Sequence, residues 1–519
     1  METSVPSRRL IVMAAMVVFA CTVVLRVPSC YESFWVDELH SAWCIWGSLG
    51  DVFPRADLGH QSPFYFVGLW CWKQIFGDSE LALRMSSVLA VAASSVVLTI
   101  GVARWTQSLA AGATAGFVIA LESNSLFFGT ELRPYAFVML FSSVAVVCFL
   151  RLSAISSRSE DRSAWIGIMV AILLAMLCQP TAIGVLAWLP LALLLVWLVR
   201  DRRQLLKFSL SDGFLLLSAA AVGFALWRVT LGESWQQRTN WASFATATRV
   251  AEIWQVWDWT WLLVVPLSVT LVAVSVAKIQ RANVSISAVI FATLLLALIS
   301  VLATSLYWLI ARADWVPVWH RRYFIAVLPL FACVAGGAIG ALEITLRPYG
   351  NVRFAGVVTA MALVVALPYQ QGTLVRLTDY PVALVTRGED WRAAIGWVRS
   401  NAEPKDLVFL DAGLVEANAW LPPGVMGSSL FLSEQRREYL VFAASGPYDP
   451  KTDVVPIDAG FLTPKWRVVA DVESRTRRVF VISRQAANRV KVSVPQGSRV
   501  LGFGNVSVVF QSSEIDQSD

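Results

Sequence analysis

Residues 8–44 of the chain read RRLIVMAAMVVFACTVVLRVPSCYESFWVDELHSAWC. Two arginines come first, followed by an apolar run from Leu10 to Val27 and then a polar segment that contains Asp37, Glu38 and His40. An apolar run of about 18 residues or more is long enough to cross a bilayer as a helix. Because no small-x-small cleavage site follows, the run predicts an uncleaved signal anchor rather than a signal peptide.

The composition of the whole chain extends this prediction. Of its 519 residues, 57% are hydrophobic and 15% are charged, and the mean hydropathy is +0.62. A soluble protein cannot bury that much apolar surface, so lipid must solvate it. The net charge of +6 is compatible with nucleic-acid binding, but no basic run alternates with aromatic residues, and cytoplasmic loops explain the charge better. We expect a polytopic protein of the inner or plasma membrane with no nucleic-acid partner.

Hydropathy predicts about eleven spans, several of them on the short side of the length that a bilayer requires. They begin at Leu10, Met85, Leu109, Pro134, Ala164, Thr181, Phe208, Thr260, Ser285, Tyr323 and Phe354. One further stretch, PFYFVGLWCWKQIF at residues 63–76, is shorter, contains Lys73 and is rich in the aromatic residues that favour membrane interfaces.

The basic residues decide the topology. If residues 63–76 do not cross, the basic loops from Arg8 and Arg9 to the cluster at 200–207 all lie on the cytoplasmic side, as the positive-inside rule requires. If they do cross, that cluster would lie outside. We therefore expect a juxtamembrane helix at 63–76, a cytoplasmic N-terminus and external segments at 28–84, 122–133, 230–259 and 311–322.

After about residue 369 the composition changes to that of a soluble domain. The predicted fold is therefore an all-α polytopic membrane domain, residues 1–369, followed by an extracytoplasmic α/β domain, residues 370–519. In EDWRAAIGWVRSNAEP (389–404), Trp391, Ile395 and Val398 share one helical face and a proline ends the segment. Four strand-like runs follow: DLVFLDAG (406–413), KWRVVADVES (465–474), RRVFVISR (477–484) and VLGFGNVSVVF (500–510).

Two adjacent carboxylates beside a histidine, at Asp37, Glu38 and His40, are not explained by packing. Their simple alternative is an acidic solvated loop. Further polar residues gather at the same predicted membrane face, namely His60, Arg84, Glu131, Arg133, Tyr135 and Arg321. A helix-end salt bridge is the simple alternative for Glu131 and Arg133, and headgroup anchoring is the alternative for Arg321.

Carboxylates and guanidinium groups at one water–lipid boundary suit group transfer from a lipid phosphate. A carboxylate can act as general base toward a hydroxyl. Arginines can hold a phosphate with two hydrogen bonds and stabilise it as it leaves. No GxGxxG after a strand and no P-loop is present, so no nucleotide site is expected. Cys30, Cys44 and Cys71 fall in the first external segment, and the sequence leaves a disulfide among them open.

Four segments resemble the GT-C glycosyltransferases, in the branch of bacterial protein-mannosyltransferase-like and aminoarabinose-transferase-like enzymes. They are SFWVDELHSAW (33–43), HQSPFYFVGLWCWKQIFGDSELALRMSS (60–87), FFGTELRPYAFVMLF (127–141) and HRRYFIAVLPLFA (320–332). The resemblance covers the first ~150 residues and the tenth span, and the helix at 389–404 followed by a strand is similar to the soluble tail of such proteins.

The resemblance implies a GT-C fold and inverting transfer of a sugar, a hexose or a pentose, from a polyprenyl-phosphate carrier to a hydroxyl of a glycan, lipid or protein. It makes Asp37, with Glu38 beside it, the catalytic base and Glu131 the second catalytic carboxylate. Arg133, Arg84, Arg321 and His60 would bind the donor phosphate, and His40 and Tyr135 the acceptor or sugar. The family usually has His-Pro-Pro where this chain has His60-Gln61-Ser62-Pro63, so no role is carried over to residues 61 and 62. The chain shows too few ligands to predict a metal, although some relatives bind one.

A transporter or flippase of a lipid-linked sugar is the alternative function, since it would use the same polar groups to bind without reaction. Transporters tend to show inverted repeats and broken helices with charge at mid-membrane. Here no symmetry between halves is visible and the charged residues cluster at one predicted face, which favours the enzyme.

The topology can be tested by labelling single cysteines from outside the cell. A cysteine introduced within residues 372–387 should react with an impermeant reagent, and one at Gln204 should not, because only this arrangement satisfies the positive-inside rule. The reverse pattern would mean that residues 63–76 span the membrane.

Overall fold

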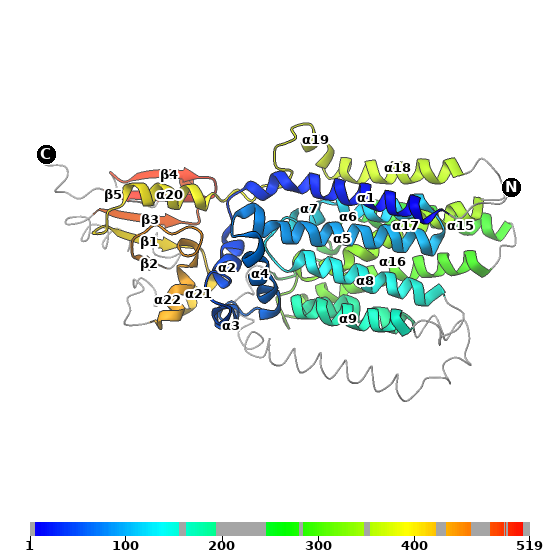
Figure 1. Ribbon diagram of the computed structural model, residues 1–519, viewed down its shortest axis with the longest axis horizontal. Coiled ribbons are helices and arrows are strands. Elements are labelled where there is room, and N and C mark those ends of the chain that lie inside the picture. The colour runs from blue at the N-terminus through cyan, green and yellow to red at the C-terminus, as the bar shows by residue number, and fades with distance from the viewer. Residues whose placement is uncertain are drawn as a thin grey trace, which may run out of the picture. The chain divides into compact units, whose positions relative to one another are not determined.

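The computed structural model describes residues 6–154, 162–193, 245–279, 284–346, 353–421, 432–457, 478–492, 494 and 497–511 (Figure 1). The contacts divide the chain into two compact units. The helical unit contains residues 1–30 and 84–385, and the mixed unit contains residues 31–83 and 386–519. Residues 31–83, most of the segment predicted to be external, thus group with the C-terminal residues, which the composition of the sequence does not indicate.

The helical unit consists of long apolar helices joined by short connections. Its elements are α1 (Arg8–Arg26), most of α5 (Glu80–Thr106), α6 (Leu109–Leu121), α7 (Ser123–Phe128), α8 (Tyr135–Ala154), α9 (Arg162–Cys178), η3 (Pro180–Ala182), α10 (Ile183–Leu186), α14 (Glu252–Gln255), η5 (Thr260–Val264), α15 (Val265–Ile279), α16 (Val284–Arg312), η6 (Arg321–Tyr323), η7 (Ile325–Val327), α17 (Leu328–Leu346), α18 (Arg353–Gln370) and α19 (Thr373–Leu377).

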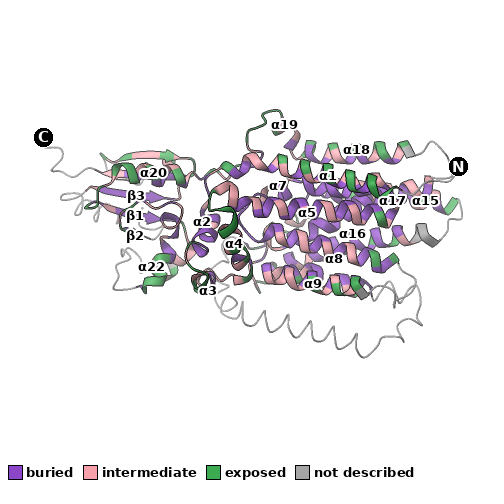
Figure 2. Ribbon diagram, in the orientation of Figure 1, coloured by how far each residue is buried: buried purple, intermediate pink, exposed green. Residues whose placement is uncertain are grey.

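Among the described residues, six helices are long and apolar enough to cross a membrane, and four shorter apolar helices accompany them. Large apolar side chains on α1 and α18 point outward, including Met13 at 63% exposure and Phe354 at 74% (Figure 2). A water-soluble protein would not leave such faces uncovered, so lipid must solvate them. The chain is an integral membrane protein.

The predicted spans agree in part with these helices. Most of the predicted starts coincide with, or lie within a few residues of, a described apolar helix. The span predicted from Phe208 and the basic cluster at 200–207 lie outside the described residues, as does the first half of the segment at 230–259. The structure therefore does not establish the number eleven.

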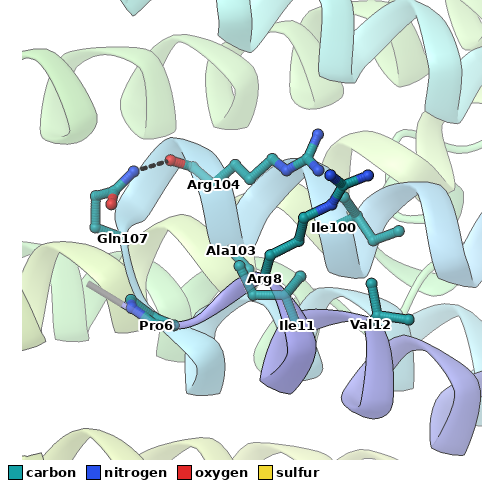
Figure 3. Close-up of a pocket in the computed structure, with 8 residues that line it drawn as sticks. All are labelled: Pro6, Arg8, Ile11, Val12, Ile100, Ala103, Arg104 and Gln107. Carbon is teal, nitrogen blue, oxygen red and sulfur yellow. Dashed lines mark hydrogen bonds between the residues drawn. The ribbon is translucent and has the colours of Figure 1, made fainter. Parts of the chain in front are cut away.

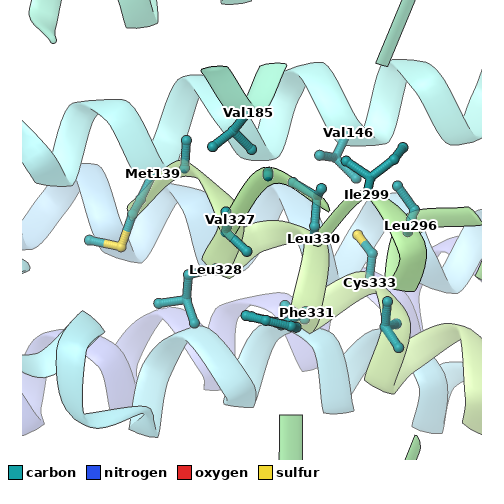
Figure 4. Close-up of a cluster of buried hydrophobic side chains, with 14 of the residues drawn as sticks. Met139, Val146, Val185, Leu296, Ile299, Val327, Leu328, Leu330, Phe331 and Cys333 are labelled. Atoms are coloured by element: carbon teal, nitrogen blue, oxygen red, sulfur yellow. The ribbon is translucent and has the colours of Figure 1, made fainter. Parts of the chain in front are cut away.

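Helix α17 forms the centre of the helical unit and packs against α6, α15 and α16. Leu328, Leu330, Phe331 and Cys333 enter the main apolar cluster together with side chains such as Val146 (Figure 4). Small residues allow this close packing: a Cβ at Gly336 would lie 2.7 Å from the carbonyl oxygen of Ala111 in α6. In membranes, where apolar surface gains nothing by leaving lipid, small residues let helix backbones approach and gain van der Waals contact.

A buried arginine connects three helices of this unit by hydrogen bonds. The guanidinium of Arg26, at the end of α1, donates to the carbonyl oxygens of Ala120 at 2.9 Å and Ile119 at 3.2 Å, at the end of α6. It also donates to Ser125 Oγ of α7 at 2.9 Å. The last carbonyl groups of a helix lack partners within the helix and carry partial negative charge, so a cation is well placed there.

The mixed unit combines short helices with a sheet to which its described residues contribute five strands. Its helices are α2 (Val36–Cys44), α3 (Leu49–Leu58), α4 (Pro63–Phe76), α20 (Trp391–Asn401), α21 (Val415–Trp420), α22 (Glu434–Leu440), η9 (Phe442–Ala444) and α24 (Ala487–Val490). The helix predicted at 63–76 is confirmed with those bounds. A proline at its first position begins it, since proline needs no hydrogen-bond partner there, and Gly77 with φ of 89° ends it.

The sheet has the order β2-β1-β3-β5-β4. Strand β1 (Leu407–Asp411) pairs in parallel with β2 (Val454–Pro456) and with β3 (Val479–Ser483). Strand β5 (Val506–Gln511) pairs antiparallel with β3 and with β4 (Arg499–Phe503). The run predicted as one strand at 500–510 is therefore a hairpin, because Gly504 has a φ of 66° and turns the chain. The run at 465–474 lies outside the described residues.

Helix α20 packs on this sheet as its spacing predicts. Trp391, Ile395 and Val398 are buried, and the ring of Trp397 lies 6.0 Å from that of Phe480 in β3. Asp390 begins the helix because its side chain accepts a hydrogen bond from the N–H of Ala393 at 3.0 Å. The helix ends before Pro404, which cannot continue it.

Candidate functional site

The two adjacent carboxylates, Asp37 and Glu38, lie on the first turn of α2, not in a loop. Glu38 is fully buried: its Oε2 accepts a hydrogen bond from the N–H of Trp35 at 3.3 Å and lies 3.9 Å from Nε of Arg387. Asp37 is only half-buried. Neighbouring residues on a helix point about 100° apart, so two side chains that look equivalent in the sequence face different surroundings. Asp37 is the member of the pair that solvent can reach.

A carboxylate from the C-terminal residues anchors the start of α2. Glu389, 9% exposed, accepts a hydrogen bond from the N–H of Val36 at 3.0 Å. The same carboxylate accepts from Nε1 of Trp391 at 2.8 Å and from Nε of Arg484 at 2.7 Å. The first N–H groups of a helix lack partners within the helix, and its N-terminus favours negative charge. Glu389 therefore fixes the residue next to Asp37.

A second contact holds the approach to α2. The hydroxyl of Tyr448 accepts a hydrogen bond from the N–H of Phe34 at 3.0 Å and donates one to Glu80 Oε1 at 2.7 Å. Burial, with the negative charge of Glu80, raises the pKa of Tyr448. Glu80 also receives a hydrogen bond from Arg392 at 2.9 Å. Residues of the C-terminal domain thus hold the backbone on the N-terminal side of Asp37.

The two predicted histidines of the mixed unit have different environments. His40 is 4% exposed, and its ring lies 5.4–6.0 Å from those of Trp43, Phe66, Tyr439 and Phe442. A Cβ at Gly59 would collide with the imidazole, so glycine makes room for it. His40 therefore packs as part of an aromatic core, and a sugar could touch it only if these rings moved.

His60, between α3 and α4, is half-buried and has a φ of 50°. Few non-glycine residues adopt this left-handed conformation, which carries strain. Strain of this kind is often found at functional positions. The observation is consistent with the phosphate-binding role predicted for His60, which stays a prediction.

The predicted residues of the helical unit lie at the ends of its helices. Glu131, Arg133 and Tyr135 occupy the turn before α8 and its first residue, and all three are buried. Ser87 Oγ of α5 donates to the carbonyl oxygen of Glu131 at 2.6 Å. One turn earlier on α5, buried Arg84 donates to the carbonyl oxygen of Cys30 at 3.2 Å. Burying charged groups costs free energy unless other groups compensate, so such residues often serve a function.

Arg321 belongs to a separate polar group of the helical unit. It lies exposed on η6 and donates to Oδ1 of Asn124 at 3.1 Å and to the carbonyl oxygen of Gln255 at 3.3 Å. Asn124 in turn donates to the buried carboxylate of Glu122 at 2.6 Å. Glu122 also accepts from the N–H of Ser125 at 2.8 Å and so caps α7. The sequence had marked Glu122 only as the first residue of a loop.

The predicted residues thus fall into two sets. Asp37, Glu38, His40 and His60 belong to the mixed unit, and Arg84, Glu131, Arg133, Tyr135 and Arg321 to the helical unit. In the part of the chain that the structure describes, no three His, Cys, Asp or Glu side chains gather as a metal site would need. The described cysteines form no disulfide.

One cavity of about 240 Å³ lies in the helical unit, between the start of α1 and the end of α5 (Figure 3). No predicted site residue lines it. Its lining consists of Pro6, Arg8, Ile11, Val12, Ile100, Ala103, Arg104 and Gln107.

The fold is similar to that of ArnT from Cupriavidus metallidurans in the apo state, with a TM-score of 0.50 and 14% sequence identity over 97% of both chains. ArnT from the same organism bound to undecaprenyl phosphate gives a TM-score of 0.49 and 15% identity over 98% of both chains. The oligosaccharyltransferase of Archaeoglobus fulgidus in the apo form gives 0.49 and 12%, over 92% of this chain and 70% of that one. No protein-family model and no curated protein matches the chain.

At 14% identity the likeness to apo ArnT concerns the fold alone. It confirms, at that level, the resemblance to GT-C proteins that the sequence motifs had indicated. The apolar helices and the small C-terminal sheet of this chain are both features that the sequence predicted.

The anchor at the start of α2 gives a testable prediction. Glu389→Ala leaves the N–H of Val36, the indole of Trp391 and the guanidinium of Arg484 without their acceptor, which should destabilise the mixed unit by about 3 kcal/mol. Thermal unfolding in detergent, followed with a thiol-reactive dye that reports exposure of buried Cys44, measures the loss. Glu403→Ala removes the ion pairs of an exposed carboxylate with Lys405 and Arg478 and should change stability by less than about 1 kcal/mol, because Arg478 keeps its pair with Asp406. Equal unfolding of the two variants would contradict the anchoring role.

Proposed function

We propose that the chain is a membrane glycosyltransferase that moves a sugar from a polyprenyl-phosphate carrier to an acceptor hydroxyl on the extracytoplasmic side. The observation that carries the proposal is the half-buried Asp37, held on the first turn of α2 by Glu389 and Tyr448. The GT-C-like fold and the four sequence motifs support the same activity. A lipid-linked donor suits an integral membrane protein because its phosphate can reach the site from the bilayer surface.

In the proposed reaction the carboxylate of Asp37 takes the proton of the acceptor hydroxyl. The acceptor oxygen then forms a bond to the anomeric carbon, while the bond from that carbon to the phosphate oxygen breaks. The polyprenyl phosphate leaves with the electron pair, and attack from the opposite side inverts the configuration. General-base catalysis and electrostatic stabilisation of the leaving group together lower the activation free energy of the transfer. Glu131 is the second carboxylate of this proposal.

The leaving phosphate needs positive charge and hydrogen-bond donors. We assign this task to Arg133 and Arg84, with Arg321 and His60 as further donors. A guanidinium offers a planar fork that matches two phosphate oxygens, whereas an ammonium offers only a point charge. Arg133 and Arg84 are buried, so their interaction with a phosphate would be screened little by water and salt.

The activity as a whole is tested by incubating membranes that contain the chain with undecaprenyl-phosphate sugars and measuring product masses. A product heavier than its acceptor by one sugar residue is expected. Movement of the lipid-linked sugar across the membrane without any glycosidic product would instead establish the flippase.

The role of Asp37 is tested by Asp37→Asn. The change keeps the shape of the side chain and should lower the transfer rate by about 10²–10⁴-fold, because no base remains at this position. Stability should fall by no more than about 1 kcal/mol, which is the usual value of a carboxylate at a helix N-terminus. Transfer is measured as product formed per mole of purified chain.

Glu38→Gln is the matched control for Asp37→Asn. It changes a buried group that caps α2 and should lower stability by about 1–3 kcal/mol, while the folded protein keeps most of its activity. If Asp37→Asn transfers sugar at the full rate, Asp37 is not the general base, and Glu131 becomes the favoured candidate for that role.

Arg133→Lys tests the phosphate contact. Lysine keeps the charge but loses the fork, so the KM for the donor should rise by about tenfold, the usual effect of losing one hydrogen bond to a charged group. Arg104→Lys, at an exposed helix end, should leave the KM for the donor unchanged. If Arg133→Lys transfers sugar as fast as the unaltered chain, Arg133 serves only to anchor the helix end.

A further inference from the structure

The cavity between the start of α1 and the end of α5 contains two cations that the proposed reaction does not use. Arg8 and Arg104 both line it, and Figure 3 shows their guanidinium groups extending toward the same side of the cavity. Both arginines are exposed, and among the described residues no carboxylate forms an ion pair with either of them. Two like charges at one cavity oppose each other, so an anion bound there would be stabilised by both.

The first turn of α1 adds to this positive charge. The N-terminus of a helix carries partial positive charge and favours acidic side chains. The first turn of α1 instead begins with Arg8 and Arg9 and contains no acidic residue. The start of the helix is therefore electrostatically unfavourable by itself, and an anion in the adjoining cavity would compensate it.

The connection from α5 to α6 holds the polar edge of the cavity in place. Gln107 follows the last residue of α5 with a φ of 56°, and its side-chain amide donates to the carbonyl oxygen of Arg104 at 2.6 Å. The hydroxyl of Ser108 accepts a hydrogen bond from the N–H of Ala111 at 3.0 Å and caps α6. These contacts fix the backbone from which the side chain of Arg104 extends.

The apolar part of the lining continues onto the outer surface of α1. It includes Ile11, Val12 and Ile100. Val12 and Met16, one helical turn apart, are both exposed. Cavities that enclose a whole small molecule usually measure about 300–1,000 Å³. A cavity of about 240 Å³ is therefore suited to a headgroup whose acyl chains lie outside it, along α1.

The cavity is far from the arginines to which we assign the donor phosphate. Arg84 and Arg104 both lie on α5, about 20 residues apart, which is about 30 Å at the rise of an α-helix. This distance matches the thickness of the hydrocarbon core of a bilayer. A headgroup at Arg104 would thus lie in the leaflet opposite to that of Arg84, so one headgroup cannot occupy both places.

We propose that this cavity binds the phosphate headgroup of an anionic phospholipid, whose acyl chains lie along the exposed apolar face of α1. A guanidinium can donate two parallel hydrogen bonds to phosphate oxygens, and basic pockets between membrane helices attract anionic lipids. A soluble phosphate compound would match the two cations but not the apolar residues beside them. The lipid would connect the start of α1 to the end of α5 in one leaflet.

Lipid binding to the purified full-length chain in detergent, measured by native mass spectrometry, tests this site. The unaltered chain should bind phosphatidylglycerol, and Arg8→Gln and Arg104→Gln should each weaken that binding by about tenfold, as loss of a hydrogen bond to a charged group does. Arg9→Gln is the matched control, because Arg9 is exposed and is not among the residues that line the cavity. It removes the same charge from the same segment and should bind the lipid as the unaltered chain does.

Two further ligands separate the contributions of charge and acyl chains. Phosphatidylethanolamine has no net charge and should bind at least about tenfold more weakly than phosphatidylglycerol. Glycerophosphoglycerol has the same headgroup without acyl chains and should also bind at least about tenfold more weakly. The site would be overturned if Arg8→Gln combined with Arg104→Gln bound phosphatidylglycerol as the unaltered chain does, if Arg9→Gln weakened binding as much as Arg8→Gln, or if the two phospholipids bound equally. Glycerophosphoglycerol that binds as tightly as phosphatidylglycerol would contradict the lipid and identify a soluble phosphate compound as the ligand.

Discussion

The carboxylate of Glu389 is the contact on which the predicted catalytic residue depends. It accepts hydrogen bonds from an indole, a guanidinium and the N–H of Val36, which lies 353 residues earlier in the chain. A helix N-terminus offers N–H groups without partners, and a fixed carboxylate satisfies them while matching the positive end of the helix dipole. Because Val36 directly precedes Asp37, this contact fixes the backbone beside Asp37. The C-terminal domain is therefore part of the architecture around the predicted base.

The sequence predicted the local features of this architecture correctly. The bounds of α4, the buried face of α20, and the strands β1 and β3 follow from hydrophobic periodicity and from prolines and glycines at the ends. These signals act over a few residues, so a single sequence contains them. The hairpin at Gly504 was read as one strand because glycine inside an apolar run also occurs in continuous strands.

Long-range features could not be predicted in this way. The grouping of residues 31–83 with the C-terminal residues depends on pairs such as Tyr448 with Phe34 and Glu389 with Val36. Nothing in the residues around Glu389 or Glu122 distinguishes these carboxylates from others at the ends of helices. The sequence also could not separate Asp37 from Glu38, since their exposure depends on which way one short helix faces.

The charges of the two units differ in a way that fits the two substrates of the proposed reaction. The helical unit buries arginines, including Arg26, Arg84 and Arg133. Arg26 donates to carbonyl groups of α6, and Arg84 and Arg133 are the two buried arginines to which we assign the anionic lipid donor. The mixed unit holds the partly exposed carboxyl group of Asp37, which would repel a phosphate and could accept a hydrogen bond from a neutral hydroxyl compound. In the proposed reaction, this repulsion would also keep the polyprenyl phosphate away from Asp37, so the carboxylate to which we assign the base would also select against the wrong orientation of the donor.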